Sequence, residues 1–306
     1  MSKQPSGNRP SYQKPWLSYP DQVQQLVDQG LTVPDRAAAE AFLAHINYYR
    51  FSGYCLAFEQ QRHQFVPGAT FEQVQAAYEF DLILRDLVVE ALEMIEVDFR
   101  TKIAYHFGGR YGAFGHTTAT NFFHVFNHGD WLDRLREEAD RSSELFVQHF
   151  RNKYAEFPDL PVWIVMEVMS FGALSKMFHG MVRNDQKDIA RLYGAQPRDL
   201  QSWMHHLVYI RNLCAHHSRL WDRQWAIKPL MPAARMWQPP SVPTNDRLFA
   251  TLLILYHLMK RCPAIVGFAL GWRGRVDAHM ANPPAVQNAA ALMGMPPAWQ
   301  QHPVWN

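Results

Sequence analysis

Apolar residues along most of this chain recur at steps of three and four positions, the spacing of one face of an α-helix. The alternation of polar and apolar residues that is typical of strands is nearly absent. The clearest helical patterns cover Asp21–Val27, Asp35–Ala44, Thr70 to about Phe107, Asp130–Lys153, Val162–Met181, Asp185–Leu192, Asp199–Ala215 and Asp246–Arg261. We therefore predict an all-α fold, a helical bundle with additional N-terminal and C-terminal helical segments.

Local signals indicate where the long central helix begins and ends. Thr70 is followed three residues later by Gln73, the spacing of a capping box at a helix start. The pattern weakens near Tyr78, which suggests a break there. Residues 108–115 are rich in glycine but lack the strand-then-helix context of a phosphate-binding loop, so we predict a connector.

These patterns divide the chain into four parts. Residues 1–15 are polar and predict a flexible lead, and residues 16–69 predict an N-terminal helical segment. Residues 70–228 predict the helical core. Residues 229–306 predict a C-terminal helix that follows an irregular Pro-rich stretch and ends in a Pro- and Trp-containing cap. We expect the last 25 or so residues to lie across the main body.

Composition narrows the class of protein. With 48% hydrophobic and 19% charged residues over 306 positions, the chain is an ordinary globular protein, and a net charge of +2 does not by itself indicate a nucleic-acid binder. Its three cysteines lack the spacing of a zinc site or disulfide framework. The N-terminus has no apolar run, and the later ones are too short or too interrupted to span a bilayer. We expect a soluble, cytoplasmic protein with no membrane association.

The run RNLCAHHSRLWDR, residues 211–223, carries the candidate chemistry at the end of a predicted amphipathic helix. On an ideal helix Asn212 and His216 lie about 40° apart, whereas Arg211 and His216 lie about 140° apart. All three can address one phosphate if the helix ends near Ala215, or if a second chain brings its own copy opposite. Geometry alone leaves both alternatives open.

These residue types suit the cleavage of RNA. The guanidinium of Arg211 matches phosphate oxygens, and the imidazole of His216 can move protons near neutral pH. Asn212 can orient either group. RNA supplies its own nucleophile in the 2′-hydroxyl, so this chemistry requires no metal or other cofactor. Residues 197–235 also hold six Arg or Lys against two acids, interleaved with aromatic residues, as a single-stranded RNA track needs.

Several nearby residues admit two interpretations. His217 is an alternative base to His216. The i,i+4 pairs Asp81/Arg85 and Glu96/Arg100 can be packing salt bridges or supports of the active site. Arg219 and Arg223 can bind phosphate or pair with Asp222 or another acid, and His124 with His128 has a spacing that can hold zinc but no evident third ligand. An Arg–His pair on a helix also occurs by chance.

The motif at residues 211–223 resembles the signature of the Abi-like (AbiD/AbiF-type) abortive-infection family, a branch of the HEPN superfamily. Four other segments resemble parts of the same family: residues 46–54, the 81–100 helix pattern, residues 161–172, and residues 293–305. HEPN nucleases carry an arginine, a polar neighbour and a histidine four to six residues after the arginine. Arg211, Asn212 and His216 match those three positions.

The resemblance implies a HEPN-type helical bundle and a homodimer that brings two motifs together. It implies metal-independent RNA cleavage at Arg211, Asn212 and His216, leaving 2′,3′-cyclic phosphate and 5′-hydroxyl ends, and supported by Glu96 and Arg100. The implied biology is phage defence by a toxin-like ribonuclease, held in check by an RNA or protein antitoxin. The alternative is a non-catalytic RNA-binding or regulatory module. A DNA-binding regulator is less favoured, since no helix-turn-helix pattern is evident.

Overall fold

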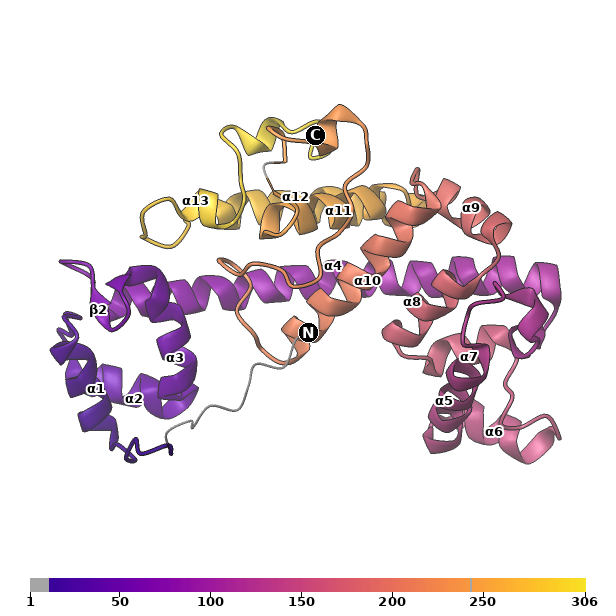
Figure 1. Cartoon of the computed structure of the whole chain (residues 1–306), viewed down its shortest axis with the longest axis horizontal. Coiled ribbons are helices and arrows are strands. Elements are labelled where there is room, and N and C mark those ends of the chain that lie inside the picture. Colours follow the sequence, from indigo (N-terminus) through magenta and orange to yellow (C-terminus); the bar gives the residue numbers. More distant parts are fainter. Residues whose placement is uncertain (1–10, 243) are drawn as a thin grey trace. The chain divides into compact units, whose positions relative to one another are not determined.

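The computed structural model describes residues 11–242 and 244–306, and this part of the chain is helical apart from one two-stranded sheet (Figure 1). The predicted all-α class is therefore confirmed. The described residues divide into two compact units, the first ending at Tyr78 and the second beginning at Glu79. Residues 1–10 of the predicted flexible lead lie outside the described residues, and the finer division into four parts stays a prediction.

The first unit is a small helical cluster closed by a hairpin. It contains α1 (Tyr19–Asp28), α2 (Arg36–Ile46), α3 (Tyr48–Cys55), the 3-10 turn η1 (Leu56–Phe58), β1 (Glu59–Gln61) and β2 (Gln64–Phe65). The side chain of Asp35 caps α2 by accepting a 2.9 Å hydrogen bond from the amide of Ala38. Phe42, Phe51 and Phe71 meet in the core of this unit, with ring centroids 4.5–6.1 Å apart. The antiparallel hairpin was not predicted, because its strands are short and polar.

The helix α4 (Phe71–Tyr111) begins in the first unit and continues into the second. Its start is the predicted capping box, since the Thr70 amide donates to Gln73 Oε1 at 3.0 Å and the Gln73 amide donates to Thr70 Oγ1 at 3.3 Å. The suggested break near Tyr78 is wrong, because the helix runs through it.

The predicted connector at residues 108–115 is wrong in its first part. Gly108 and Gly109 belong to α4, and the chain turns only after Tyr111, at Gly112, where φ is +78°. Gly108 packs closely against α7 (Val162–Val168), since a Cβ there would lie 3.2 Å from Val162 Cγ1, a tight contact. Close helix packing is therefore consistent with a glycine at this position, which the local pattern assigned to a loop.

The second unit holds the rest of the helices. They are α5 (His128–Arg141), α6 (Leu145–Lys153), α7 (Val162–Val168), α8 (Phe171–Gly180), α9 (Arg183–Leu192), α10 (Pro197–Ala215), α11 (Leu248–Lys260), α12 (Val266–Met280) and α13 (Ala289–Leu292). Five 3-10 turns connect them: η2 (Gly115–Thr117), η3 (Ala119–Asn121), η4 (Arg235–Trp237), η5 (Pro263–Ile265) and η6 (Trp299–Gln301). The helices α9 and α10 confirm the predictions for residues 185–192 and 199–215.

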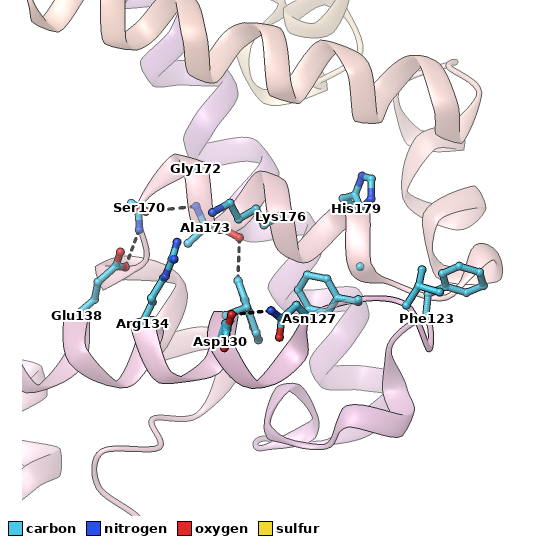
Figure 2. A pocket seen from close by; sticks show the side chains of 14 residues that line it. Phe123, Asn127, Asp130, Arg134, Glu138, Ser170, Gly172, Ala173, Lys176 and His179 are labelled. Carbon is cyan, nitrogen blue, oxygen red and sulfur yellow. Dashed lines mark hydrogen bonds between the residues drawn. The ribbon is translucent and has the colours of Figure 1, made fainter. Parts of the chain in front are cut away.

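Two predicted helices are each split in two. The charged segment 130–153 breaks after Arg141, and the apolar segment 162–181 breaks at Ser170. Ser170 starts α8 as an N-cap, with its hydroxyl accepting from the amide of Ala173 at 3.3 Å. Its own amide donates to Glu138 on α5 at 3.0 Å (Figure 2). The contact with α5 thus stabilises Ser170 as the N-cap of α8, a role that the apolar pattern of this segment did not indicate.

The 15-residue α12 follows the predicted helix Asp246–Arg261 and was not among the predicted helices. Three glycines between positions 267 and 274 lower the helix propensity of this segment. Its stability comes from packing along α4: Trp272 Nε1 donates to the Leu87 carbonyl at 2.7 Å, and the His279 ring stacks on Phe80.

The interior of the second unit centres on α11, which is buried along nearly its whole length. The C-terminal residues lie on this body as predicted, since Trp305 is buried and its indole donates to Asp277 at 2.8 Å. Among the described residues no single helix is both long and apolar enough to cross a membrane, although the bent pair 248–260 and 263–280 passes that test together by length and composition.

Candidate functional site

The helix α10 carries the motif and ends inside it. The last helical residue is Ala215, and His216 is the C-cap. The His217 amide donates to the Cys214 carbonyl at 2.9 Å and the Ser218 amide to the Leu213 carbonyl at 2.8 Å, the two bonds of a Schellman motif. His217 occupies the left-handed position of this motif with φ of +51°, where glycine is usual. The end of α10 is therefore fixed by its own backbone.

Arg211, Asn212, His216 and His217 are all exposed or partly exposed at the end of α10. The helix end at Ala215 meets one of the two conditions under which the three motif residues can address one phosphate. The backbone holds this turn in place, with the His216 amide donating to the Asn212 carbonyl at 3.0 Å. These four side chains are therefore accessible to solvent.

Arg211 faces α4. It lines a cavity of about 320 Å³ together with Glu96 and Arg100, the pair that the sequence nominated as supports. Glu96 and Arg100 form an ion pair with side chains 18% and 13% exposed, and Arg100 also donates to the carbonyl of Met166 on α7. The structure thus places Glu96 and Arg100 beside Arg211. His216 does not line this cavity.

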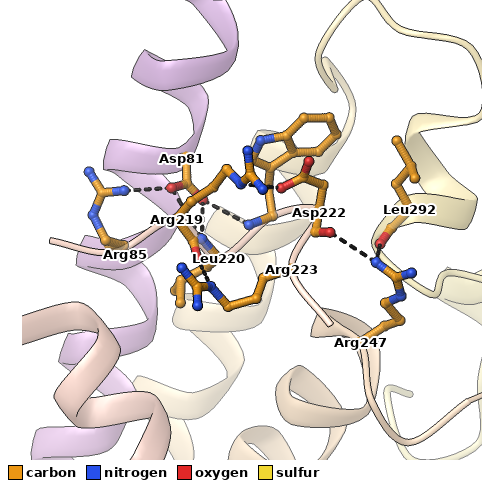
Figure 3. Close-up of polar contacts among 9 residues, drawn as sticks. Asp81, Arg85, Arg219, Leu220, Asp222, Arg223, Arg247 and Leu292 are labelled. Atoms are coloured by element: carbon orange, nitrogen blue, oxygen red, sulfur yellow. Dashed lines mark hydrogen bonds and ion pairs between the residues drawn. The ribbon is translucent and has the colours of Figure 1, made fainter. Parts of the chain in front are cut away.

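The second half of the motif, after His216, is tied to α4 through Asp81 (Figure 3). The Asp81 carboxylate is fully buried, pairs with Arg85 at 2.5 Å, and accepts hydrogen bonds from the amides of Leu220 at 3.0 Å and Trp221 at 2.8 Å. A buried carboxylate is stable only when charged or hydrogen-bonding partners surround it, and here it has both. Of the two interpretations of the Asp81/Arg85 pair, the structure shows a buried salt bridge that also anchors the segment following His216.

The two arginines proposed to bind RNA are engaged in local contacts. Arg219 Nε lies 2.6 Å from Asp222 Oδ1, and Arg223 Nε donates to the Arg219 carbonyl at 2.7 Å (Figure 3). Burial raises the pKa of Asp222, and the neighbouring Arg219 opposes that rise. The pairing of Arg219 with Asp222, one of the two alternatives, is present in the structure. Phosphate binding by Arg219 and Arg223 stays a prediction.

Residues 226–230 then run back along α10. The His206 ring bonds through Nδ1 to the Ile227 carbonyl at 2.7 Å and through Nε2 to Thr251 Oγ1 at 2.9 Å. Trp203 Nε1 donates to the Leu230 carbonyl at 2.8 Å. Burial lowers the pKa of His206 to about 4, so its ring is neutral at pH 7 and acts as a packing group. The neighbouring His205 is exposed instead.

Comparison with known proteins identifies the family. A family model described as Abi-like protein matches residues 41–222, more than half of the chain. This chain belongs to the Abi-like family. No curated protein and no solved structure gave a significant match. The family takes its name from abortive infection, a form of phage defence, and the matched region of this Abi-like chain ends at Asp222, one residue before the end of the motif.

The histidines with zinc-like spacing have other contacts in this Abi-like protein. His128 is buried and its Nε2 bonds to the His116 carbonyl at 2.8 Å, while His124 is exposed and its ring lies beside Phe123. Across residues 11–242 and 244–306, no group of three His, Cys, Asp or Glu side chains is arranged to hold a metal ion. Cys214, within the motif, is buried, and this burial raises the pKa of its thiol to about 12.

Sequence reasoning recognised Asp81 only as half of an i,i+4 pair. Its bonds to Leu220 and Trp221 join residues 139 and 140 positions apart, which no local pattern indicates. One signal was available: an acidic residue on the apolar stripe of a helix is rarely buried without a specific partner. That signal marks Asp81 as structurally engaged but does not say with what.

Proposed function

We propose that this Abi-like protein is a metal-independent endoribonuclease of the HEPN type that acts as a phage-defence effector. The observation that carries the proposal is the exposed group Arg211, Asn212 and His216 on the terminal turn of α10, where the helix stops at Ala215. The match to the Abi-like family over residues 41–222 supports it independently.

In the proposed reaction the 2′-oxygen of one ribose attacks the adjacent phosphorus. The 2′-hydroxyl loses its proton, the new 2′-O–P bond forms, and the P–O5′ bond breaks while the 5′-oxygen gains a proton. The products are a 2′,3′-cyclic phosphate and a 5′-hydroxyl end. Arg211 would stabilise the charge that builds on the phosphate oxygens, His216 would transfer a proton, and Asn212 would orient them.

The surroundings favour this use of the site. Catalytic groups act best when packing and hydrogen bonds hold their supports in place. The Schellman turn at His217 fixes the backbone of His216, and the Asp81 carboxylate fixes the chain that follows. Beside Arg211, the Glu96–Arg100 ion pair lines the same cavity and would help to orient the Arg211 side chain.

We extend the proposal to a homodimer. Arg211 and His216 lie about 140° apart around an ideal helix axis, so one chain's Arg211 can act with the His216 of a second copy placed opposite. Such a pairing would give two motifs and a shared cleft. An antitoxin, either RNA or protein, would block this open site until infection.

The test is induced expression of the wild type beside His216→Ala and His217→Ala, with total RNA sequenced for new 5′-hydroxyl ends. We expect growth arrest and new ends with the wild type and with His217→Ala, and neither with His216→Ala. Undiminished cleavage by a well-folded His216→Ala protein contradicts the assignment. RNA binding that survives His216→Ala, with no cleavage by any of the proteins before or after phage infection, identifies a non-catalytic RNA-binding module instead.

A further inference from the structure

A groove of about 680 Å³ lies between α8 and α10, on the approach to the motif. From α8 it is lined by Lys176 and His179, and from α10 by Arg198, Gln201 and His205. The His179 ring pairs through Nδ1 with the side-chain amide of Gln201, which joins the two walls.

This groove attracts anions because its lining carries positive charge and no negative charge. Its lining residues include two permanent cations and two histidines but no carboxylate. Lys176 and Arg198 are at least partly exposed, and neither forms an ion pair within the described part of the chain. Arg198 interacts with the neighbouring Asp199, where it opposes the rise that burial causes in the pKa of that carboxyl, but the two form no ion pair. Both cations therefore keep most of their attraction for phosphate.

A larger groove of about 1160 Å³ beside α4 is less suited to anions, although it also holds several cations. Each of its arginines and its lysine already has an acidic partner. The pairs are Arg100 with Glu96, Lys102 with Asp98 at 2.7 Å, Arg110 with Asp185 at 3.0 Å, and Arg191 with Asp188 at 3.6 Å. The two grooves therefore differ in the charge they offer to a ligand rather than in the number of basic residues.

The α8–α10 groove continues along α10 toward the motif. Arg198, His205 and Asn212 are seven residues apart, and His216 is 18 residues beyond Arg198, which is five full helical turns. All four therefore share one face of the helix, over about 27 Å. Val208, which lines the groove, is one turn before Asn212, so a chain lying in the groove reaches the motif without leaving this face.

A second hollow, of about 500 Å³, adjoins the groove and shares Gly172, Lys176 and His179 with it. Figure 2 shows Lys176 and His179 on α8, Arg134 on the neighbouring α5, and the Phe123 side chain at the far end of this hollow. The Phe123 ring is half exposed, which leaves a face for an unpaired base to stack on.

From this arrangement we propose that the α8–α10 groove binds the single-stranded RNA that flanks the scissile phosphate. This inference rests on the proposed ribonuclease function and specifies where the RNA substrate binds on the protein. Lys176 and Arg198 contact backbone phosphates, His205 lies between them and the motif, and Phe123 stacks on a base. Single-stranded RNA is favoured over a duplex because a base must be unpaired to stack on an exposed ring.

The test measures binding of a fluorescent 12-nucleotide RNA by anisotropy over a range of salt concentrations. His216→Ala is the parent, so that the probe stays intact. We expect Lys176→Ala/Arg198→Ala to weaken binding by about tenfold or more and to lower the slope of log K against log salt by about 1.4, the value for two lost phosphate contacts on a single strand. Phe123→Ala weakens binding without changing the slope.

The matched control is Arg183→Ala/Lys187→Ala, which removes two cations from α9 that line neither hollow. It should bind as the parent does. In the cleaving background the groove variant should raise KM with kcat within about twofold. The proposal is overturned if the groove variant binds RNA with the same affinity and the same salt slope as the parent. It is also overturned if the parent binds no RNA. An equal loss of affinity for a duplex of the same sequence overturns its single-stranded part.

Failure of this proposal is distinguishable from failure of the proposed function. If the wild type cleaves RNA while the groove variant has normal binding and a normal KM, the groove proposal is wrong and the ribonuclease proposal stands. If no cleavage is seen before or after phage infection, but the groove variant shows the expected change in the slope of log K against log salt, the ribonuclease proposal is wrong and the groove is an RNA-binding site.

Discussion

The carboxylate of Asp81 accepts a 2.8 Å hydrogen bond from the main-chain amide of Trp221, which lies 140 residues further along the chain. The same carboxylate is buried against Arg85. One side chain of α4 thus neutralises a buried cation and fixes the backbone that leaves the motif. The position of His216 depends on α10 before it, on the turn at His217 directly after it, and on this anchor a few residues further along the chain.

Replacing Asp81 with asparagine should destabilise the protein strongly. The amide of the Asp81→Asn variant keeps an oxygen for the Trp221 amide but removes the charge opposite Arg85, and breaking a buried ion pair costs about 3–5 kcal/mol. Asp86→Asn, at an exposed position on the same helix, is the control and should change the free energy of unfolding by less than about 0.5 kcal/mol. Urea denaturation measures both. Equal effects of the two substitutions would show that the Asp81 contacts contribute little.

The left-handed conformation of His217 predicts an unusual order of stability. Both His217→Gly and His217→Ala remove the imidazole, but only glycine adopts φ of +51° without steric cost. The glycine variant should therefore be more stable than the alanine variant by about 1 kcal/mol. Thermal or urea denaturation of the two proteins checks this, and an alanine variant that is equally stable would mean that the turn rearranges.

Stability should fall in mild acid because of buried histidines. Burial lowers the pKa of His206 to about 4, whereas an unfolded histidine titrates near 6.5. Between about pH 6.5 and about pH 4, His206 is therefore protonated in the unfolded state but neutral in the folded state. The free energy of unfolding is full above this window and decreases as pH falls through it, by up to about 3 kcal/mol for this residue.

Urea denaturation at about pH 7.5, 6 and 5, which spans the upper part of this window, measures the dependence. His206→Gln should be less stable at neutral pH, because it disturbs the bonds to Ile227 and Thr251, but its stability should vary less with pH. His205→Gln, the exposed neighbour, should follow the wild type. A His206→Gln profile as steep as that of the wild type would contradict the assignment.

Arg100 should contribute to stability as well as to the site. Arg100→Met keeps much of the length of the side chain but leaves the Met166 carbonyl without its donor and Glu96 without its partner, a loss of about 2 kcal/mol. Arg191→Met removes an exposed arginine from a 3.6 Å pair and should cost less than about 1 kcal/mol. Cleavage should also fall in Arg100→Met, since Arg100 shares a cavity with Arg211. Cleavage unchanged from the wild type would limit Arg100 to a structural role.

The sequence by itself determined the helical class, the capping box at Thr70, most helix positions and the motif at residues 211–223. These features are local: a helical period, a cap and a short motif are complete within a few turns of chain. The sequence also allowed a helix end near Ala215, as one condition for Arg211, Asn212 and His216 to address one phosphate. This was possible because the residues that close the turn are adjacent to one another.

Only the tertiary structure decided which partners those local elements have. The helix α12 forms despite its glycines because Trp272 and His279 pack on α4, and Gly108 belongs to α4, where it packs closely against Val162 of α7. The anchor between Asp81 and Trp221 and the groove between Lys176 and Arg198 each join segments from different parts of the sequence. Burial and charge pairing depend on the whole fold, so a single sequence names such residues without showing which of them meet.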